Sequence, residues 1–448
     1  MKVKRTINYG LEKSIAVNRA NNNLLDTIKM YVPDIVFTKI GKVYQAKCPF
    51  KKQKDTRFYV WPEKQCWFTY GDMDLWGDIV SFVSNLKGMN PKDAVNDIVE
   101  KIGEKADKTI NIPLYSANQD FLFFKNVGVR ITGSVMELIP LELINPDPQS
   151  DYIIDHDFKF ESNNLFEIKY SESYLTTIDD NNLDPLDIFT LKCNWGNLSY
   201  AQFLYNTSNI YWKQQQEGKT LTESQEKEIA FDFINKVCAL GYACRKYKDR
   251  SKAYMLMAVE DTRNINSGTN AGIGKSLFYL PLKYVRHLSY QDGHFTRSDR
   301  SDLIYSEVVS EKTDVILFDD LSEYFPIDLF FNGITGDMNI RKPFENSKNI
   351  PFEESPILIS TSNNLPKRLS KSALRRLWFC NFSDYYHISY ENGVEQSRKP
   401  NIEFGKNIIL DYSEEEMNKM YFFIIQCIQS YILINDITRS MHINVQSL

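Results

Sequence analysis

The feature that most constrains this chain is a glycine-rich run at residues 269–276, TNAGIGKS. It lies between an apolar segment at 253–259 and the helical sequence LFYLPLKY. A loop of this kind wraps backbone N–H groups around a nucleotide phosphate, while its lysine reaches the β- and γ-phosphates and its serine hydroxyl holds Mg²⁺. The pattern departs from the usual one at Thr269, which stands where the first glycine is expected. The residues that we assign to ATP binding are Gly272, Gly274, Lys275 and Ser276, the last also as a Mg²⁺ ligand.

Two later apolar segments end in side chains that suit the same chemistry. The segment DVILFDD (314–320) ends in two carboxylates. We expect Asp319 to orient the Mg²⁺ shell and Asp320 to polarise the attacking water. The segment SPILISTSN (355–363) ends in Asn363, whose amide is predicted to bind the γ-phosphate or the water. Apolar strands that alternate with helices indicate an α/β fold. The polar side chains at the ends of these strands, together with the glycine-rich run, predict an ATP-hydrolysing site that uses Mg²⁺ and ATP.

Two adjacent arginines, Arg375 and Arg376, follow these segments, and either guanidinium would stabilise the transferring phosphoryl group in a neighbouring subunit. Over about residues 238–390 the order Lys–Ser, Asp–Asp, Asn, Arg–Arg resembles that of superfamily 3 helicases, the AAA+-related hexameric helicases of small viruses, phages and plasmids. The segments ALGYACRKYKD and FSDYY (382–386) are part of the same resemblance. It implies a P-loop, AAA+-like three-layer core and a homo-oligomeric ring, expected to be a hexamer, acting on single-stranded or forked DNA.

The same family carries a hairpin that enters the central pore and grips single-stranded DNA, and the matching stretch here is residues 333–355. By this resemblance Arg341, Lys342 and Lys348 meet phosphates, while Phe344 stacks on a base or packs behind the hairpin. The alternative is that these are ordinary exposed charges of a hairpin.

Residues 20–103 resemble the zinc-ribbon domain of bacterial primases, through Cys48-Pro-Phe, the aromatic run RFYVWPEKQ (57–65) and the Gly-Asp-x-x-x-Phe segment at 77–82. Lys51 occupies the position of the ligand histidine. Thr69 and Asp72 stand where the last two cysteines would lie, and Cys66 with Cys48 and Asp72 would make only a poor site. One thiol of four cannot hold tetrahedral zinc, so no zinc is expected.

An aromatic core is expected to replace the metal in this domain. A basic face with interleaved aromatic residues would contact DNA, as this fold does in primases; the alternative is a scaffold or subunit-docking module. The predicted core residues are Phe50, Phe58, Trp61, Trp67 and Phe68, and the predicted DNA-binding residues are Lys51, Lys52 and Arg57, with Lys54 and Lys64 beside them.

Charge and composition are consistent with this assignment. Residues 1–66 carry 14 Lys and Arg against 5 Asp and Glu, although the whole chain has a net charge of −5. Such asymmetry suits a module that meets phosphates. No apolar run is long enough for a membrane span, no secretory signal is visible, and seven dispersed cysteines indicate a reducing compartment, so we expect a cytoplasmic protein without membrane contact.

A catalytic centre for primer synthesis is not recognisable. Asp155, His156 and Asp157 form a cluster that resembles a metal site, but they lie in a loop-like acidic stretch, and we do not assign them a metal.

The predicted function is that of an ATP-dependent DNA helicase of the replicative, phage or mobile-element type, with a separate primase or other replication proteins as partners. Two other hypotheses stay open. One is an ATP-switched origin- or DNA-binding protein that does not unwind processively, and the other is a structural DNA-binding scaffold with a decayed ATPase. The predicted domains are a metal-free ribbon-like domain (1–105), an irregular β-containing connector (106–190), a helical domain (191–250), the ATPase core (251–400) and a C-terminal helical segment (401–448).

Overall fold

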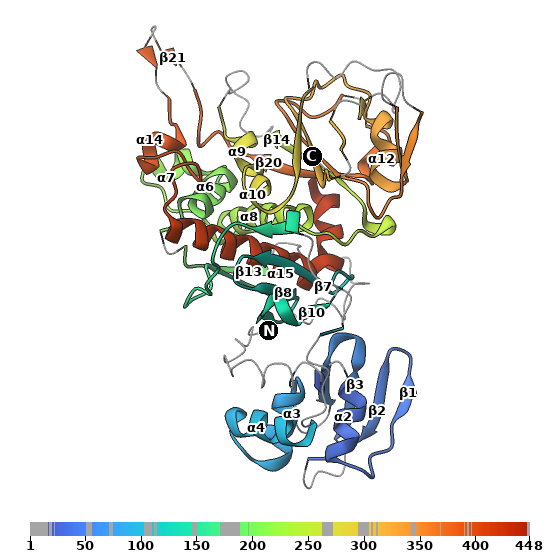
Figure 1. The fold of residues 1–448 in the computed structure, drawn as a ribbon. Helices are drawn as coiled ribbons and strands as arrows, with labels where there is room; N and C mark the ends of the chain where they lie inside the picture. The colour runs from blue at the N-terminus through green and yellow to red at the C-terminus, as the bar shows by residue number, and fades with distance from the viewer. Residues whose placement is uncertain are drawn as a thin grey trace. The chain divides into compact units, whose positions relative to one another are not determined.

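The chain has a mixed α/β fold, as predicted, and forms two compact units (Figure 1). The N-terminal unit comprises residues 5–112 and 139–147, and the large unit includes 113–138 and 148–448. The computed structural model describes residues 17, 20, 21, 23–50, 56–70, 75–102, 110, 111, 114–145, 150–170, 189–195, 197–261, 272–293, 304, 305, 308–310, 312–341, 346–367, 369–388, 390, 391, 394, 395 and 397–445.

A five-stranded parallel sheet organises the large unit, with the strands in the order β15, β16, β19, β14, β20. Strand β19 is thereby inserted between β14, which precedes the glycine-rich run, and β16, which ends in Asp319. Because the strands are parallel, their carboxyl ends share one edge, and open α/β sheets bind ligands at that edge. The bounds are β14 (Met255–Glu260), β15 (Leu288–Asp292), β16 (Val315–Asp319), β19 (Ile357–Ser362) and β20 (Leu377–Phe382).

Side chains of this sheet alternate between two hydrophobic cores. On β16, Val315 and Leu317 enter one core, while Ile316 and Phe318 enter the other. Strands that are apolar on both faces are typical of a parallel sheet covered by helices on each side. The first core includes residues of α6 (Ser199–Ser208), α8 (Glu223–Ala243), α9 (Lys275–Tyr279), α10 (Leu282–Val285) and α15 (Glu414–Val445). The second includes residues of η8 (Ile327–Phe330), α12 (Phe331–Thr335) and α13 (Lys371–Leu374).

The long helices α8 and α15 pack against each other in the first core (Figure 1). Helix α8 begins with a capping box, in which Thr222 Oγ1 accepts from Gln225 N and the Gln225 side chain accepts from Thr222 N. The two backbones meet closely at Gly241, where an added Cβ would lie 2.2 Å from the carbonyl oxygen of Cys427. Only glycine allows this approach.

Smaller sheets and helices complete the large unit. Four strands pair in the order β11, β7, β8, β9, with bounds β7 (Gln119–Phe124), β8 (Gly128–Thr132), β9 (Met136–Ile139) and β11 (Ile153–Ile154). Three two-stranded pairs are β12 (Phe166–Tyr170) with β13 (Phe189–Cys193), β17 (Met338–Ile340) with β18 (Lys348–Ile350), and β21 (Tyr390–Glu391) with β22 (Val394–Glu395). The short helices are α7 (Trp212–Gln216) and α14 (Pro400–Phe404).

The N-terminal unit is an antiparallel meander with helices on one face. Its aromatic core joins Phe50, Phe58, Trp67 and Phe82, whose ring centroids lie 5.1–5.9 Å apart. The strands are β1 (Thr38–Ile40), β2 (Val43–Lys47), β3 (Arg57–Trp61), β4 (Cys66–Tyr70) and β5 (Trp76–Gly77), beside the pair β6 (Ile110–Asn111) and β10 (Ile144–Asn145). The helices are α2 (Leu24–Tyr31), α3 (Ile79–Lys87) and α4 (Pro91–Ile102).

Two of the residues predicted for this core are not part of it. Strand β3 alternates strictly, so that Phe58 and Val60 are buried while Trp61 is only partly buried. The same alternation on β4 buries Trp67 and places Phe68 on the opposite face. The prediction counted aromatic residues without applying the period of two along a strand.

Among the described residues, no helix combines the length and the apolar character that crossing a bilayer requires.

Candidate functional site

The glycine-rich run ends in a turn that only glycine adopts readily. Gly272 has φ of 78° and Gly274 has φ of 94°. A Cβ on Gly272 would lie 2.8 Å from Ile388 Cδ1, and one on Gly274 would lie 2.6 Å from Phe203 Cε2. Both glycines are therefore required by conformation and by space. Thr269 lies outside the described residues, so the departure from the usual pattern is not tested there.

Side chains from three segments meet at the carboxyl edge of the parallel sheet. Lys275 Nζ donates to Asn363 Oδ1 at 2.7 Å, and Asn363 Nδ2 donates to Asp320 Oδ1 at 2.9 Å. The amide of Asn363 thus links the lysine that follows the glycine run to the second carboxylate after β16. This linkage follows from strand order, because β19 separates β14 from β16.

A second set of contacts surrounds the first carboxylate. Ser276 Oγ donates to Asp319 Oδ1 at 2.8 Å, and Thr361 Oγ1 donates to the same oxygen at 2.6 Å. Tyr290 OH donates to Asp319 Oδ2 at 3.4 Å. A hydroxyl and a carboxylate at this separation are the oxygen ligands that Mg²⁺ takes beside a nucleotide, so the donor set fits the predicted magnesium site.

The electrostatics of Lys275 agree with a site built to hold phosphates. Its side chain is 9% exposed, and burial lowers the pKa of its ammonium group. The nearby carboxylates of Glu260, Asp320 and Asp319 oppose that effect. A buried cation beside these acids can exchange its contact with Asn363 for a phosphate oxygen when a nucleotide enters.

Sequence reasoning missed Thr361, Tyr290 and Glu260. Thr361 lies on β19, two positions before Asn363, which directly follows the strand. The period of two along a strand predicts side chains on the same side at this spacing, so the spacing was a usable signal. Tyr290 lies on the edge strand β15, which no motif marks.

The arginine pair lies at the opposite edge of the sheet. Strand β20 begins at Leu377, and the carbonyl oxygen of Arg376 accepts from the backbone of Met255, the first residue of β14, at 2.8 Å. The six residues of β20 separate this edge from the carboxyl edge, a span of roughly 20 Å at about 3.3 Å per residue. Neither arginine can therefore reach the Lys275 site of its own chain.

The two arginines differ in their surroundings. Arg376 donates to Ser372 Oγ at 2.6 Å and to Thr335 Oγ1 at 3.4 Å, and its guanidinium lies 4.6 Å from the Phe331 ring. Arg375 is exposed, and in the part of the chain that the structure describes its guanidinium has no hydrogen bond or ion pair. Arg376 is thus committed to its own chain, whereas Arg375 is available to another.

The predicted DNA hairpin is present in part as β17 and β18, in which Ile340 pairs with Lys348. Arg341 follows β17, and both Arg341 and Lys348 are exposed. Lys342 and Phe344 lie outside the described residues. At the base of the hairpin, Arg250 forms an ion pair with Asp337 at 2.8 Å.

In the N-terminal unit, hydrogen bonds close the turn between β4 and β5 and cap the helix that follows, α3. Thr69 N donates to Leu75 O at 2.7 Å, and Thr69 Oγ1 accepts from Leu75 N at 2.9 Å. Asp78 caps α3 by accepting from Ser81 N at 2.9 Å. Gly77 is required beside it, because a Cβ there would lie 1.8 Å from Ser81 Oγ.

The zinc site that the primase-like ribbon implies does not fit these residues. Thr69, at one ligand position, uses its hydroxyl to close the turn to Leu75, and Lys51 at the histidine position is a cation. Among the described residues, no three His, Cys, Asp or Glu side chains converge as a metal site. Lys51, Lys52 and Asp72 lie outside the described residues.

The other face of the meander is aromatic and basic; we call it the outer sheet face. Tyr59 pairs with Phe68 and their rings stack at 5.1 Å, while Phe68 also pairs with Trp76. Cross-strand partners share a face, so this surface is continuous over three strands, and Tyr70 (70% exposed) and Trp76 (46% exposed) are open to solvent. Its residues are Lys47, Arg57, Tyr59, Trp61, Phe68, Tyr70 and Trp76.

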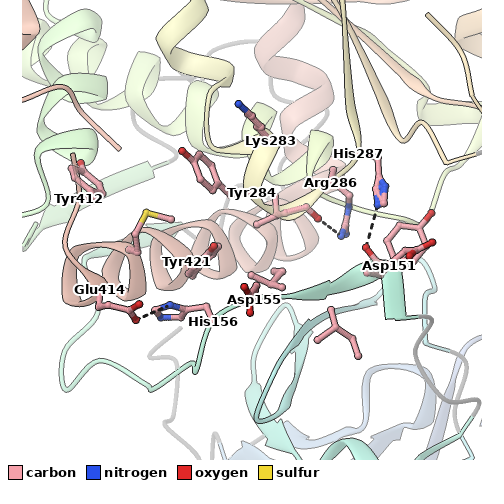
Figure 2. A pocket seen from close by; sticks show the side chains of 15 residues that line it. Asp151, Asp155, His156, Lys283, Tyr284, Arg286, His287, Tyr412, Glu414 and Tyr421 are labelled. Carbon is pink, nitrogen blue, oxygen red and sulfur yellow. Dashed lines mark hydrogen bonds and ion pairs between the residues drawn. The ribbon is translucent and has the colours of Figure 1, made fainter. Parts of the chain in front are cut away.

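A further pocket, of about 540 Å³, lies in the large unit between residues 151–156, residues 283–287 and the start of α15 (Figure 2). Two of its carboxylates are already engaged, since Asp151 pairs with Lys312 and Asp155 with Lys125. His156 is directed toward Glu414 at 3.6 Å (Figure 2). Asp155, His156 and Asp157 do not form a metal-binding group among the described residues, and we assign the pocket no ligand.

Comparison with known proteins finds similarity to primases. Residues 11–112 match the CHC2 zinc finger family. The DNA primase of Myxococcus xanthus is 35% identical over 79 residues, which are 18% of this chain and 13% of that protein. The DNA primase of Buchnera aphidicola is 23% identical over 51% of this chain and 32% of that protein, and the DNA primase of Thermotoga maritima is 22% identical over 31% and 23%. The chain therefore spans a third or less of each of these relatives.

Among solved structures, the chain is matched to the apo A form of the NrS-1 C-terminal region, over 74% of this chain and 69% of that one. The identity is 13% and the TM-score is 0.26. A TM-score this low supports no conclusion about shared architecture.

Proposed function

We propose that the chain is an ATP-dependent DNA helicase that translocates on single-stranded DNA as a ring. The observation that carries the proposal is the convergence of Lys275, Ser276, Asp319, Asp320 and Asn363 at the carboxyl edge of one parallel sheet. These are the cation, the hydroxyl, the two acids and the amide that phosphoryl transfer to water requires. The similarity to DNA primases supports a role with DNA in replication.

Each side chain has one role in this mechanism. Lys275 and the backbone around Gly272 and Gly274 bind the phosphates, and Ser276 with Asp319 would hold Mg²⁺, which neutralises charge on the phosphate oxygens. Asp320 accepts a hydrogen bond from the attacking water and orients it. Asn363 hydrogen bonds to both Lys275 and Asp320, and its amide would bind the γ-phosphate or the attacking water when ATP is present.

Arg375 completes the site of the neighbouring subunit. It is exposed and lies at the amino edge of the sheet, so it would reach a nucleotide only across an interface between subunits. This geometry supports a homo-oligomer whose sites lie at interfaces, and a hexamer is the form we expect. Arg376 instead ties α13 to α12 within its own subunit.

Two surfaces are assigned to DNA. On the large unit, Arg341 and Lys348 flank the tip of the β17–β18 hairpin and would meet phosphates together with Lys342, while Phe344 would stack on a base or pack behind the hairpin. On the N-terminal unit, the outer sheet face offers stacking surfaces at Tyr70 and Trp76 beside Arg57. Aromatic rings between cations suit single-stranded nucleic acid without sequence preference.

Unwinding of a forked duplex tests the proposal. We expect strand separation that needs ATP and Mg²⁺ and that is lost in Lys275→Ala. ATP-dependent binding to the fork without strand separation would instead identify an ATP-switched DNA-binding protein. Fork binding that ignores ATP in both proteins would contradict both functions.

A further inference from the structure

We propose that Thr361 is a positioning residue for hydrolysis, which holds the two acids at the end of β16, Asp319 and Asp320, through a single hydroxyl group. The inference rests on the proposed ATPase function and adds a residue to that site. Thr361 is 2% exposed and lies on β19, two residues before Asn363.

The Thr361 hydroxyl makes two hydrogen bonds of opposite direction. It donates to Asp319 Oδ1 at 2.6 Å and accepts from the backbone N–H of Asp320 at 2.7 Å. The same residue accepts from Leu321 N through its carbonyl oxygen at 2.8 Å. Three consecutive residues at the end of β16, Asp319 to Leu321, are therefore tied to one threonine.

The backbone between these contacts is strained. Asp320 has φ of 58°, in the left-handed region that non-glycine residues adopt at a cost. That conformation turns the Asp320 carboxylate toward Asn363, which donates to it at 2.9 Å. Because the Thr361 hydroxyl accepts from the N–H at this turn, it stabilises the conformation that separates the roles of the two acids.

Only a hydroxyl can do this from a buried position. Serine and threonine combine one donor with acceptor lone pairs, whereas valine has the shape of threonine without either. Thr361→Val therefore removes both hydrogen bonds with almost no change in volume, and Thr361→Ser restores them. Thr27→Val is a matched control, since Thr27 is a buried threonine (3% exposed) of the N-terminal unit whose hydroxyl donates to Ala20 O.

The test measures metal binding and turnover separately in the full chain. Affinity for Mn²⁺ in the presence of ATP is followed by the electron paramagnetic resonance of free Mn²⁺, and Mg·ATP hydrolysis is measured by phosphate release. Thermal unfolding shows that each variant is folded. In Thr361→Val we expect kcat and Mn²⁺ affinity to fall ~10- to 100-fold, the effect of losing hydrogen bonds to a charged group. Binding of a fluorescent ATP analogue without metal should stay within ~2-fold, because Lys275 is untouched.

Thr361→Ser should recover both quantities to within ~5-fold, and Thr27→Val should match the wild type in both. A Thr361→Val protein that binds Mn²⁺ with ATP as tightly as the wild type would overturn the inference. If the wild type binds Mn²⁺ with ATP but does not hydrolyse it, the proposed ATPase fails while the Mn²⁺ comparison still decides the role of Thr361. Absence of metal-dependent binding in the wild type would contradict both.

Discussion

The separation of the two arginines gives a prediction that can be worked through in detail. Arg375 is exposed and without a partner among the described residues, whereas Arg376 is bonded to Ser372 and Thr335 and lies over Phe331. Arg375→Ala should therefore change stability by less than about 0.5 kcal/mol, as surface substitutions usually do. Arg376→Ala should lower the free energy of unfolding by roughly 1–3 kcal/mol, from lost hydrogen bonds and a lost cation–π contact.

For ATP hydrolysis the two substitutions should rank in the opposite order, with Arg375→Ala the more damaging. An arginine supplied across an interface is worth roughly 10³- to 10⁵-fold in kcat, so Arg375→Ala should be close to inactive. The assay that tests supply from a neighbour is a mixture of two inactive proteins, Arg375→Ala and Lys275→Ala. A site is complete at an interface where the Arg375→Ala subunit supplies Lys275 and the Lys275→Ala subunit supplies Arg375. In a random 1:1 mixture about one interface in four has this arrangement, so about a quarter of the wild-type activity should return.

Lys371→Ala is the matched control, because Lys371 is an exposed cation on α13, close in sequence to Arg375. It should leave hydrolysis unchanged. No recovery of activity in the mixture, under conditions in which the two proteins exchange subunits, would refute supply of Arg375 by a neighbour. Full activity of Arg375→Ala alone would refute the role of Arg375 itself.

Three further predictions follow from the geometry. Gly274→Ala should weaken ATP binding at least ~10-fold, because the new Cβ would lie 2.6 Å from the buried Phe203 ring. The control Gly218→Ala, at φ of 77° with open space around it, should lower the free energy of unfolding by only about 1 kcal/mol and leave ATP binding unchanged. Equal ATP affinities of the two variants in a titration would contradict this. Tyr70→Ala with Trp76→Ala should weaken single-stranded DNA binding by ~10-fold or more, at about 1–3 kcal/mol per stacked base, while Met30→Ala, an exposed residue of α2, should not; unchanged anisotropy curves would exclude the outer sheet face. Burial lowers the pKa of Lys248 to about 7, from an unfolded value of 10.5, so its charge destabilises the fold fully below pH 7 and progressively less as the pH rises toward 10.5. Lys248→Met should therefore gain roughly 2–4 kcal/mol of stability at pH 6 relative to wild type and lose that advantage by pH 10 in denaturant unfolding, and a pH-independent difference would refute the assignment.

The parallel-sheet part of the fold could be predicted because its strands are recognisable as apolar runs in the sequence. The segments 314–320 and 355–363 are apolar runs that end in Asp and Asn, and parallel strands must bring such ends together. The contacts of Asn363 with Lys275 and Asp320 are the direct result. The strand order that inserts β19 between β14 and β16 is set by packing over the whole unit, and no local pattern states it.

Other features depended on contacts that a linear pattern does not show. Trp61 and Phe68 look like core residues by composition, but the pairing of β3 with β4 turns them to the outer sheet face. Arg375 and Arg376 look equivalent, and only the positions of Thr335 and Phe331 distinguish them. The predicted domain boundaries and the absence of zinc stay predictions.

Hydrolysis of Mg·ATP, with and without single-stranded DNA, tests the central claim most directly when the wild type is compared with Lys275→Ala. The account predicts phosphate release that DNA stimulates and that the substitution abolishes, because Lys275 is the cation that meets the phosphates at the carboxyl edge of the sheet. Equal rates in the two proteins, or no release by a wild type that binds DNA, would contradict it.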